Sequence, residues 1–236
     1  MIILVTGASR GIGRAIASAA AREGHDVVVN YRAAAEAARD LVRELEDAPG
    51  RAIALQADVS LAAEARRLVE TTIEQLSGLD CVVNNAGTGV AVPIEELDEA
   101  TFNATLQVNL TGAFLVSQAA WPLMTANGGR LVFLSSGAAR TGGRLSAAYA
   151  ASKAGLEGLM HYYATNLRRY RITANAIAPS LVQSDMLGSM HVSLAEQLPL
   201  GRLGRPEEIW PAMRMILETE YLTGQTIHID AGRYMT

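Results

Sequence analysis

The stretch VTGASRGIGRAI, residues 5–16, decides the fold, because it joins a strand to a helix through a glycine-rich turn. The apolar run IILVT precedes the turn, and an Ala-rich segment with apolar residues at helical spacing follows it. Glycine permits positive φ and a close approach to the backbone, and the start of the helix directs unpaired N–H groups at the same place. The stretch therefore predicts a nucleotide site at this junction, with a merely tight turn as the alternative. The residues of the turn that we expect to bind the nucleotide are Gly7, Ser9, Arg10, Gly11, Ile12 and Gly13.

Short β-branched runs alternate with longer helical stretches along almost the whole chain. Most of the runs are continuously apolar, which indicates strands covered on both faces, as in a parallel sheet. Strands that alternate with helices predict βαβ units and a doubly wound α/β (Rossmann) fold with a parallel sheet of about seven strands, flanked by helices. We expect one domain over residues 1–236. The predicted strands are IILVT (2–6), DVVVN (26–30), RAIALQ (51–56), LDCVVN (79–84), GRLVFLS (129–135), RITANAI (171–177) and QTIHID (225–230).

Composition limits the classes of function. Hydrophobic residues make up 50% of the chain and charged residues 19%, which is typical of a soluble globular protein. The net charge of −4 and the scattered arginines argue against nucleic-acid and membrane partners. No apolar run approaches the ~18 residues of a membrane span or resembles a signal peptide, so we expect a cytoplasmic protein. The single cysteine, Cys81, and four histidines offer no metal site, and the apolar run around Cys81 favours a buried side chain over a nucleophile.

The end of the second strand bears on the choice between NAD and NADP. An acidic residue there would bind the ribose hydroxyls of NAD, whereas this chain has Asn30, followed by Tyr31 and Arg32. The guanidinium groups of Arg32 and of Arg10 can each add a charge-assisted hydrogen bond to the extra phosphate of NADP. We therefore expect NADPH/NADP+ rather than NADH, with solvated surface charges as the alternative for the two arginines.

Two further segments are expected beside the nucleotide. Asp58 ends the third strand, a position suited to the adenine edge, although it could equally be the N-cap of the next helix. Val59 would then pack beside the adenine ring. The segment at about 180–205 is the least regular of the chain, and we expect it to form a lid over the substrate.

Several short motifs occur in the order and approximate spacing of one known family. They are TGASRGIG (6–13), NNAG (84–87), NL (109–110), SS (135–136), YAASK (149–153) and NAIAPS (175–180). Over essentially its whole length the chain therefore resembles the short-chain dehydrogenase/reductase family. Within that family, the segments GRLGRPEEI (201–209), YLTGQTIHIDAG (221–232) and VVVNYR (27–32) resemble the NADPH-preferring 3-oxoacyl-acyl-carrier-protein reductases.

The resemblance implies a catalytic tetrad of Asn109, Ser136, Tyr149 and Lys153. Ser136 is preferred over Ser135 because it lies 13 residues before the tyrosine, the spacing common in this branch. Tyr149 would donate the proton, and a cation four residues along the same helical face would lower the pKa of its phenol from about 10. Ser136 would hydrogen-bond the substrate oxygen as negative charge develops. Asn109 is expected to hold the helix and a water that relays protons to Lys153.

The resemblance also implies further cofactor contacts. After the fourth strand, Asn84 would stabilise the sheet, and a plain strand-ending turn is the alternative for the whole NNAG segment. Two positions depart from the family pattern, because Ser180 replaces a glycine and Ser184 stands where threonine is more common. The residues expected to line the ribose and the nicotinamide are Asn85, Ala86, Gly87, Tyr149, Lys153, Pro179, Val182 and Ser184.

The activity implied is NADPH-dependent reduction of a ketone to a secondary alcohol, most specifically of 3-oxoacyl-acyl-carrier-protein in fatty acid biosynthesis. The substrate would be a small molecule or a carrier-bound acyl group, with the acyl carrier protein as a candidate partner, and the family implies a homotetramer or homodimer. His161 would pack in the subunit interface, with a role as an acid as the alternative. Arg130 could meet the acidic carrier or be a solvated residue before the fifth strand. The alternatives are a related enzyme acting on a steroid, polyol, sugar or small ketone, and a non-catalytic NADP-binding sensor or scaffold.

Lys153 is the only lysine among the 20 Lys and Arg residues. A drift towards arginine would explain why lysine is rare. Arginine would serve badly at this position, because its planar guanidinium stays protonated and lacks the compact shape of an ammonium group. The composition therefore agrees with a chemical role for Lys153.

Overall fold

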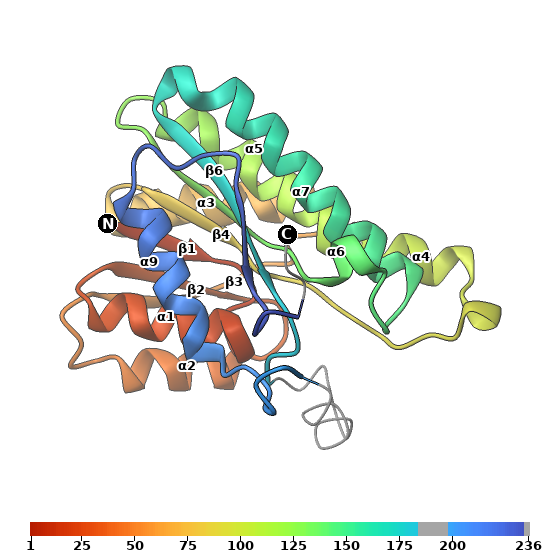
Figure 1. The fold of residues 1–236 in the computed structure, drawn as a ribbon. Helices are drawn as coiled ribbons and strands as arrows, with labels where there is room; N and C mark the ends of the chain where they lie inside the picture. Colours follow the sequence, from red (N-terminus) through yellow and green to blue (C-terminus); the bar gives the residue numbers. More distant parts are fainter. Residues whose placement is uncertain (184–197, 234–236) are drawn as a thin grey trace.

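The computed structural model describes residues 1–183 and 198–233 (Figure 1). Its seven strands form one parallel sheet in the order β3-β2-β1-β4-β5-β6-β7, which confirms the predicted fold class. Each predicted apolar run forms one of these strands. The strands are β1 (Ile2–Val5), β2 (Asp26–Tyr31), β3 (Ala52–Gln56), β4 (Cys81–Asn84), β5 (Gly129–Leu134), β6 (Ile172–Pro179) and β7 (Thr226–Ile229).

Helices cover both faces of the sheet (Figure 1). One face packs against α1 (Gly11–Arg22), α2 (Ala35–Glu44) and α9 (Trp210–Glu218). The other face packs against α3 (Ala62–Leu76), α5 (Gly112–Met124) and α7 (Ala147–Leu167). The remaining helical segments are η1 (Ile94–Glu96), α4 (Glu99–Leu106), the π-helical turn η2 (Gln107–Thr111), α6 (Ala138–Thr141), η3 (Arg168–Tyr170) and η5 (Pro206–Ile209).

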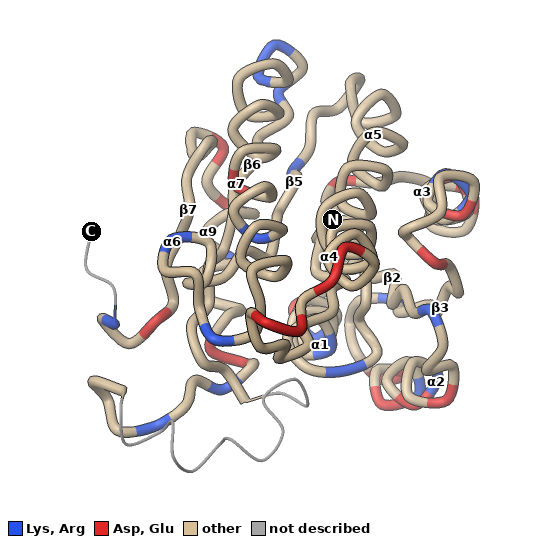
Figure 2. Tube along the Cα trace, turned by 90° about the vertical axis from the view of Figure 1, so that its right-hand side faces the viewer, with Lys and Arg blue, Asp and Glu red and all other residues tan. Residues whose placement is uncertain are grey.

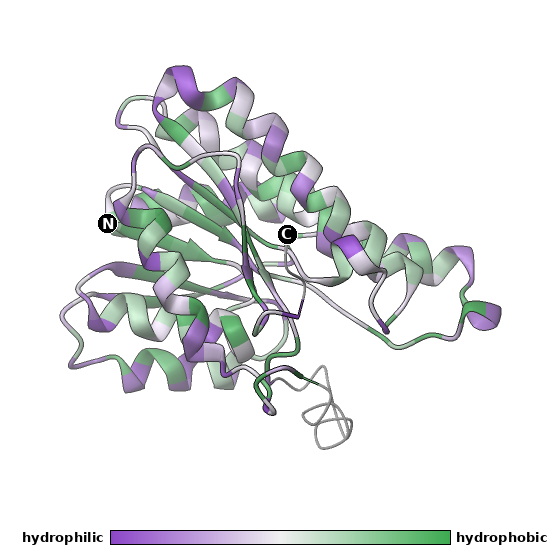
Figure 3. Cartoon of the chain, viewed as in Figure 1, coloured by the Kyte–Doolittle hydropathy of each residue, from purple (hydrophilic) through white to green (hydrophobic). Residues whose placement is uncertain are grey.

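The two apolar cores explain why the strands are continuously apolar. Successive side chains of a strand point to opposite faces, so Ile3 and Val5 enter one core and Leu4 enters the other. The same division holds in β2, where Val28 lies on the face opposite to Val27. Figure 3 shows the sheet as hydrophobic and the helices as mixed in character. A helix needs one apolar stripe, whereas each central strand needs two apolar faces.

The strand order places the candidate site. Connections run outward in opposite directions from β1 and β4, and in such a sheet ligands bind at the carboxyl ends of the strands near this switch point. The predicted site residues lie in six segments. Five of these segments lie at or after the carboxyl ends of β1, β2, β3, β4 and β5, and the sixth is at the carboxyl end of β6. The fold therefore gathers residues from six separate segments at one edge.

Arg130 is buried, contrary to the expectation from the sequence. It is the second residue of β5 and is only 8% exposed, so its interpretation as a solvated residue is wrong. It lies at the amino end of the strand, away from the carboxyl edge, and its guanidinium is 3.9 Å from the carboxylate of Glu220. Neighbouring strands bury a position that the sequence alone places at the start of a run.

The structure also shows where the cysteine and the charged residues lie (Figure 2). Cys81 is buried in β4, as expected, and burial raises the pKa of its thiol. In residues 1–183 and 198–233, no helix is long and apolar enough to cross a membrane. Basic and acidic residues are interspersed along the chain, as Figure 2 shows.

Candidate active site

Tyr149 and Lys153 lie one turn apart near the start of α7. Ser146 caps this helix, because its hydroxyl oxygen accepts a hydrogen bond from the backbone N–H of Tyr149 at 3.2 Å. The phenol of Tyr149 is hydrogen-bonded to the side chain of Ser136, which follows β5. The Nζ atom of Lys153 lies 5.6 Å from the centre of the Tyr149 ring. The structure thus brings Ser136, Tyr149 and Lys153 together.

Burial controls the charge states of this group. It raises the pKa of the Tyr149 phenol, and the hydrogen bond with Ser136 offsets part of that rise. Burial also lowers the pKa of Lys153 to about 8. The sequence predicted a phenol pKa lowered by Lys153, whereas burial raises it and only the hydrogen bond with Ser136 lowers it. The Lys153 ammonium donates its hydrogen bond to the carbonyl oxygen of Leu134 at 2.7 Å. At neutral pH the phenol is therefore protonated and stands beside a charged ammonium group.

Asn109 lies at the centre of the π-helical turn η2, and its side chain is buried. Its Oδ1 accepts a hydrogen bond from the backbone N–H of Thr88 at 2.7 Å, and its Nδ2 donates to the Thr88 carbonyl at 2.9 Å. Nδ2 also donates to the hydroxyl of Ser152 on α7 at 3.0 Å. Asn109 therefore joins the segment after β4 to the helix that carries Tyr149, and π-helical turns are frequent at functional sites.

The glycine turn and the NNAG segment are packed directly against each other. Gly7 has a φ of +62°, and a Cβ atom there would lie 2.9 Å from the Cα of Ala86. A Cβ atom on Gly13 would lie 2.7 Å from the Gly7 carbonyl oxygen and would collide with the amide of Asn85. That amide donates to the carbonyl oxygens of Thr6 and Gly7 at 2.8 and 3.0 Å. Glycine is thus required at two positions by close contact.

The Cβ side of Gly11 is open. This residue has a φ of +56°, and a Cβ atom built on it would meet nothing within 4 Å. It begins α1, whose N-cap residue, Arg10, makes no capping hydrogen bond with its side chain. A left-handed glycine with open space beside the start of a helix is suited to a phosphate group.

The residues at the end of β2 differ in exposure. Asn30 is buried, and its Oδ1 accepts from the N–H of Gly7 at 3.2 Å while its Nδ2 donates to the carbonyls of Leu55 and Ala57, each at 3.2 Å. Tyr31 lies in an apolar core. The side-chain contacts of both residues are therefore with the protein. Arg32 is exposed and reaches the carboxylate of Asp58 at 3.9 Å.

Asp58 and Val59 begin the connection after β3. Oδ1 of Asp58 accepts from the N–H and the hydroxyl of Ser60, at 3.0 and 2.6 Å. Because α3 begins at Ala62 with Leu61 as its N-cap, the alternative that Asp58 caps this helix is wrong. Val59 is buried, and a Cβ atom on Gly112 would lie 3.2 Å from its Cγ2 atom.

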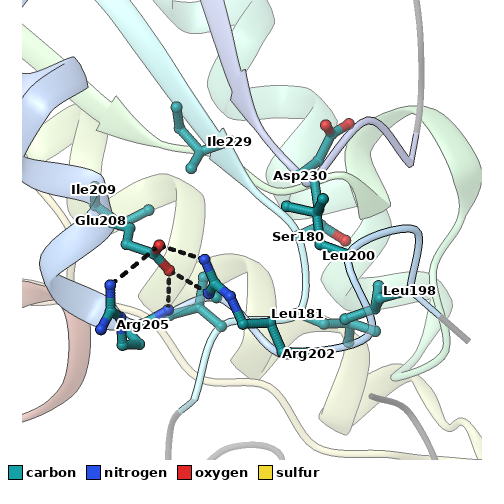
Figure 4. A pocket seen from close by; sticks show the side chains of 13 residues that line it. Ser180, Leu181, Leu198, Leu200, Arg202, Arg205, Glu208, Ile209, Ile229 and Asp230 are labelled. Carbon is teal, nitrogen blue, oxygen red and sulfur yellow. Dashed lines mark hydrogen bonds and ion pairs between the residues drawn. The ribbon is translucent and has the colours of Figure 1, made fainter. Parts of the chain in front are cut away.

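The loop after β6 borders a pocket (Figure 4). The Pro179 carbonyl accepts from the N–H of Gly137 at 3.0 Å, and Val182 pairs with Gly204 in an isolated bridge. Ser184 and most of the predicted lid lie outside the described residues. The aliphatic residues that line the pocket are Leu181, Val182, Leu198, Leu200, Ile209, Ile229 and Ala231.

A charged network stands at the rim of this pocket (Figure 4). The carboxylate of Glu208 accepts hydrogen bonds from the guanidinium of Arg202 at 2.8 and 2.7 Å and from the backbone N–H of Arg205 at 2.7 Å. These hydrogen bonds, that from Arg202 first, lower the pKa of Glu208 to about 2. The network ties the last residues of the predicted lid segment to η5.

Ser152 and Glu157 were not singled out from the sequence, and Ser135 was considered there only as the less favoured alternative to Ser136. Ser152 donates to the Tyr149 carbonyl at 2.7 Å and accepts from Asn109. Ser135 donates to the carboxylate of Glu157 at 2.8 Å. Both serines lie inside the recognised motifs, and Glu157 follows Lys153 at helical spacing, so position could have identified them. Serine and glutamate are common residue types, so the residue type alone does not indicate that Ser135, Ser152 or Glu157 belongs to a site.

Comparisons with known proteins agree with this geometry. A family model described as enoyl-(acyl carrier protein) reductase matches residues 7–233. A 3-oxoacyl-[acyl-carrier-protein] reductase of Synechocystis is 38% identical over 239 residues, which cover 99% of this chain and 97% of the relative.

Solved structures are similar over the whole chain. A short-chain type dehydrogenase/reductase from Mycobacterium marinum superposes with a TM-score of 0.94 at 28% identity, covering 100% of this chain and 96% of that one. A blue fluorescent protein from a metagenomic library, in complex with NADPH, superposes with a TM-score of 0.92 at 35% identity, covering 99% of this chain and 98% of that one. The chain belongs to the short-chain dehydrogenase/reductase family of oxidoreductases.

Proposed function

We propose that this protein reduces a ketone to a secondary alcohol with NADPH, and that its substrate is a 3-oxoacyl group carried by the acyl carrier protein. The observation that carries the proposal is the hydrogen-bonded pair of Ser136 and Tyr149, with Lys153 one helical turn away. The relative from Synechocystis supports the choice of substrate, and the NADPH-bound neighbour supports the choice of cofactor.

The residues present fit a dinucleotide. The glycine turn supplies a left-handed backbone with open space at Gly11, and we assign Gly7, Ser9 and Gly13 to the same phosphate site. Arg10 and Arg32 would bind the phosphate that distinguishes NADP from NAD, and the observation that supports this is the exposed guanidinium of Arg32 at the end of β2. When bound, the reduced nicotinamide supplies a hydride to the ketone carbon.

Tyr149 donates the proton in this mechanism. Its raised pKa keeps the phenol protonated at neutral pH, which is the form that a reduction requires. Ser136 hydrogen-bonds the ketone oxygen as negative charge develops on it. Lys153 remains charged below pH 8 and stabilises the phenolate that forms when the proton leaves. Asn109 holds α7 in place through Ser152.

A panel of substrates tests the proposal. We expect NADPH absorbance to fall in the presence of an acetoacetyl thioester, and faster than with simple ketones, sugars or steroids. If a sugar or a steroid reacts and the thioester does not, the assignment of the substrate is wrong. If the purified protein binds NADPH and reduces no carbonyl compound, a sensor or scaffold becomes the better account.

We further propose that the protein forms a homodimer or homotetramer through α5 and α7. The support is a set of exposed apolar side chains on these helices, which are joined by a hydrogen bond from the Tyr163 hydroxyl to Gln118 at 3.1 Å. The exposed apolar residues are Phe114, Leu123 and Tyr162. Burial of such side chains in a subunit interface removes them from water.

A further inference from the structure

Three consecutive residues at the carboxyl end of β5 form hydrogen bonds with α7. The carbonyl oxygen of Leu134 accepts from Nζ of Lys153 at 2.7 Å, and the side chain of Ser136 is hydrogen-bonded to Tyr149. Between these two contacts lies Ser135, whose side chain also reaches α7. Three successive residues are therefore joined to the same helix.

Ser135 is fixed to the sheet and donates to the helix. Its backbone N–H donates to the carbonyl of Ile177 on β6 at 2.8 Å, and its side chain is buried. Its hydroxyl lies 2.8 Å from Oε1 of Glu157 and 3.3 Å from the carbonyl oxygen of Lys153. A hydrogen bond to a carboxylate is stronger than one between neutral groups. The shorter contact is thus also the stronger one.

Glu157 lies on α7 one helical turn after Lys153, which itself lies one turn after Tyr149. Residues four apart on a helix lie on the same face, so Tyr149, Lys153 and Glu157 all face the end of β5. During the reaction Tyr149 loses and regains its proton, and Lys153 interacts with the charge that forms. The contact between Ser135 and Glu157 involves no reacting atom and can stay unchanged through turnover.

We propose that Ser135 and Glu157 are a pair of positioning residues: their hydrogen bond sets the position of α7 along the end of β5, and so places Tyr149 and Lys153 relative to Ser136. The inference rests on the proposed function, because it assigns a role in that reaction. A displacement of about 1 Å in a catalytic group can lower a rate by roughly 100-fold, so a contact of this kind has a large effect on turnover.

The pair acts through hydrogen bonding and not through the charge of Glu157. Burial alone lowers the pKa of Lys153, with no contribution from the carboxylate. A neutral acceptor of the same shape at position 157 keeps the hydrogen bond in a weaker form, and should therefore keep most of the positioning effect. This expectation separates positioning from an electrostatic effect on the ammonium group.

The first experiment measures turnover in Glu157→Ala, Glu157→Gln, Ser135→Ala and the double alanine variant, with Glu74→Ala on the exposed side of α3 as the control. We expect Glu157→Ala and Ser135→Ala each to lower kcat by roughly 10-fold or more, with the KM for NADPH within about two-fold of the original. Glu157→Gln should stay within about three-fold of the original kcat, because its side-chain oxygen still accepts the hydrogen bond. The double variant should be no slower than the slower single variant.

Three results would overturn the proposal. They are an unchanged kcat in Glu157→Ala, an equal loss in Glu157→Gln and Glu157→Ala, and losses that multiply in the double variant. Ser135→Ala removes the same hydrogen bond by deleting one oxygen atom. If Glu157→Ala does not fold, the kcat of Ser135→Ala decides whether the proposal holds.

A second readout is independent of turnover. Because Lys153 is the only lysine, a protein labelled with ¹³C at lysine Cε gives one lysine signal. We expect this signal to move in Glu157→Ala and Ser135→Ala, to return in Glu157→Gln and to stay in place in Glu74→Ala. A signal that does not move in either alanine variant would contradict the positioning role. If the protein reduces no ketone and its lysine signal still shifts as expected, the proposed function is wrong. The effect of the Ser135–Glu157 hydrogen bond on the position of Lys153 would then remain supported.

Discussion

At the scale of single residues, Lys153 links the composition of the chain to its chemistry. Its side chain is 5% exposed and reaches a backbone carbonyl at the end of β5. A guanidinium group is larger and planar and keeps its proton, so it cannot reproduce the contacts and the proton exchange of an ammonium group. The sequence predicted which residue would be needed, but not that the ammonium would bind the Leu134 carbonyl, because that contact depends on how α7 sits on the sheet.

The pH dependence of reduction follows from the lowered pKa of Lys153. Burial disfavours the charged form, so the ammonium is present below pH 8 and is lost as the pH rises through about 8. We expect kcat/KM for ketone reduction to fall over that range. Lys153→Arg should fold normally, lose activity by roughly 100-fold or more and lack this fall, because arginine stays charged. Arg66→Lys, on the exposed surface of α3, is the control. Near-normal turnover in Lys153→Arg would remove the role given to the lysine.

Selectivity for NADPH is expected to depend on Arg32. We expect Arg32→Asp to lower the ratio of kcat/KM for NADPH to that for NADH by roughly 10-fold or more, since one charge-assisted hydrogen bond of about 1.5 kcal/mol is lost. Arg10→Ala should change the ratio in the same direction, and Arg39→Asp on α2 should leave it unchanged. An unchanged ratio in both Arg32→Asp and Arg10→Ala would mean that neither guanidinium distinguishes the two cofactors.

At the scale of elements, turns and helices differ in how far the sequence predicts them. The glycine turn was predictable, because only glycine tolerates the φ of Gly7 together with the contact to Ala86. The inward orientation of Asn30 was not, because its four hydrogen-bonding partners come from the strand itself, the turn after β1 and the end of β3. Polar residues at strand ends look alike in a sequence, whether they face a ligand or the protein.

Two glycine substitutions compare a closely packed position at the turn with an open position on α7. Gly13→Ala should lower the melting temperature and weaken NADPH binding, because the new Cβ atom would lie 2.7 Å from the Gly7 carbonyl and displace Asn85. Gly158→Ala on α7 should instead raise the stability of the single chain by about 0.5–1 kcal/mol, because nothing in the same chain lies within 4 Å of its Cβ position and alanine favours a helix. Thermal unfolding and NADPH titration measure both effects. A Gly13→Ala protein with unchanged stability and affinity would show that the turn can relax.

At the scale of the whole molecule, the order of strands and helices was predictable from the alternation of apolar runs with helical segments. The two-faced burial of the sheet requires continuous apolar strands, and those strands were found in the chain with small differences at their ends. The burial of Arg130 was not predictable, since Arg130 is paired with Cys81 on β4 and Thr173 on β6, and its ion-pair partner Glu220 is also distant in sequence. Contacts between residues that are distant in sequence leave no pattern in the sequence around Arg130.

The proposed assembly makes a prediction about mass. We expect light scattering to give a multiple of the 25.0 kDa chain. Tyr162, which is 65% exposed, should become part of the interface, so Tyr162→Arg should shift the mass towards a single chain. Tyr221→Arg, outside these helices, is the control. A single-chain mass for the unchanged protein would contradict the proposed interface.

The most direct test of the central claim compares the unchanged protein with Tyr149→Phe in the reduction of an acetoacetyl thioester. We predict that the unchanged protein consumes one NADPH for each 3-hydroxyacyl product formed. Tyr149→Phe should bind NADPH with similar affinity and lose turnover by roughly 100-fold or more, because the proton donor is missing. Turnover by Tyr149→Phe at the rate of the unchanged protein would contradict the account.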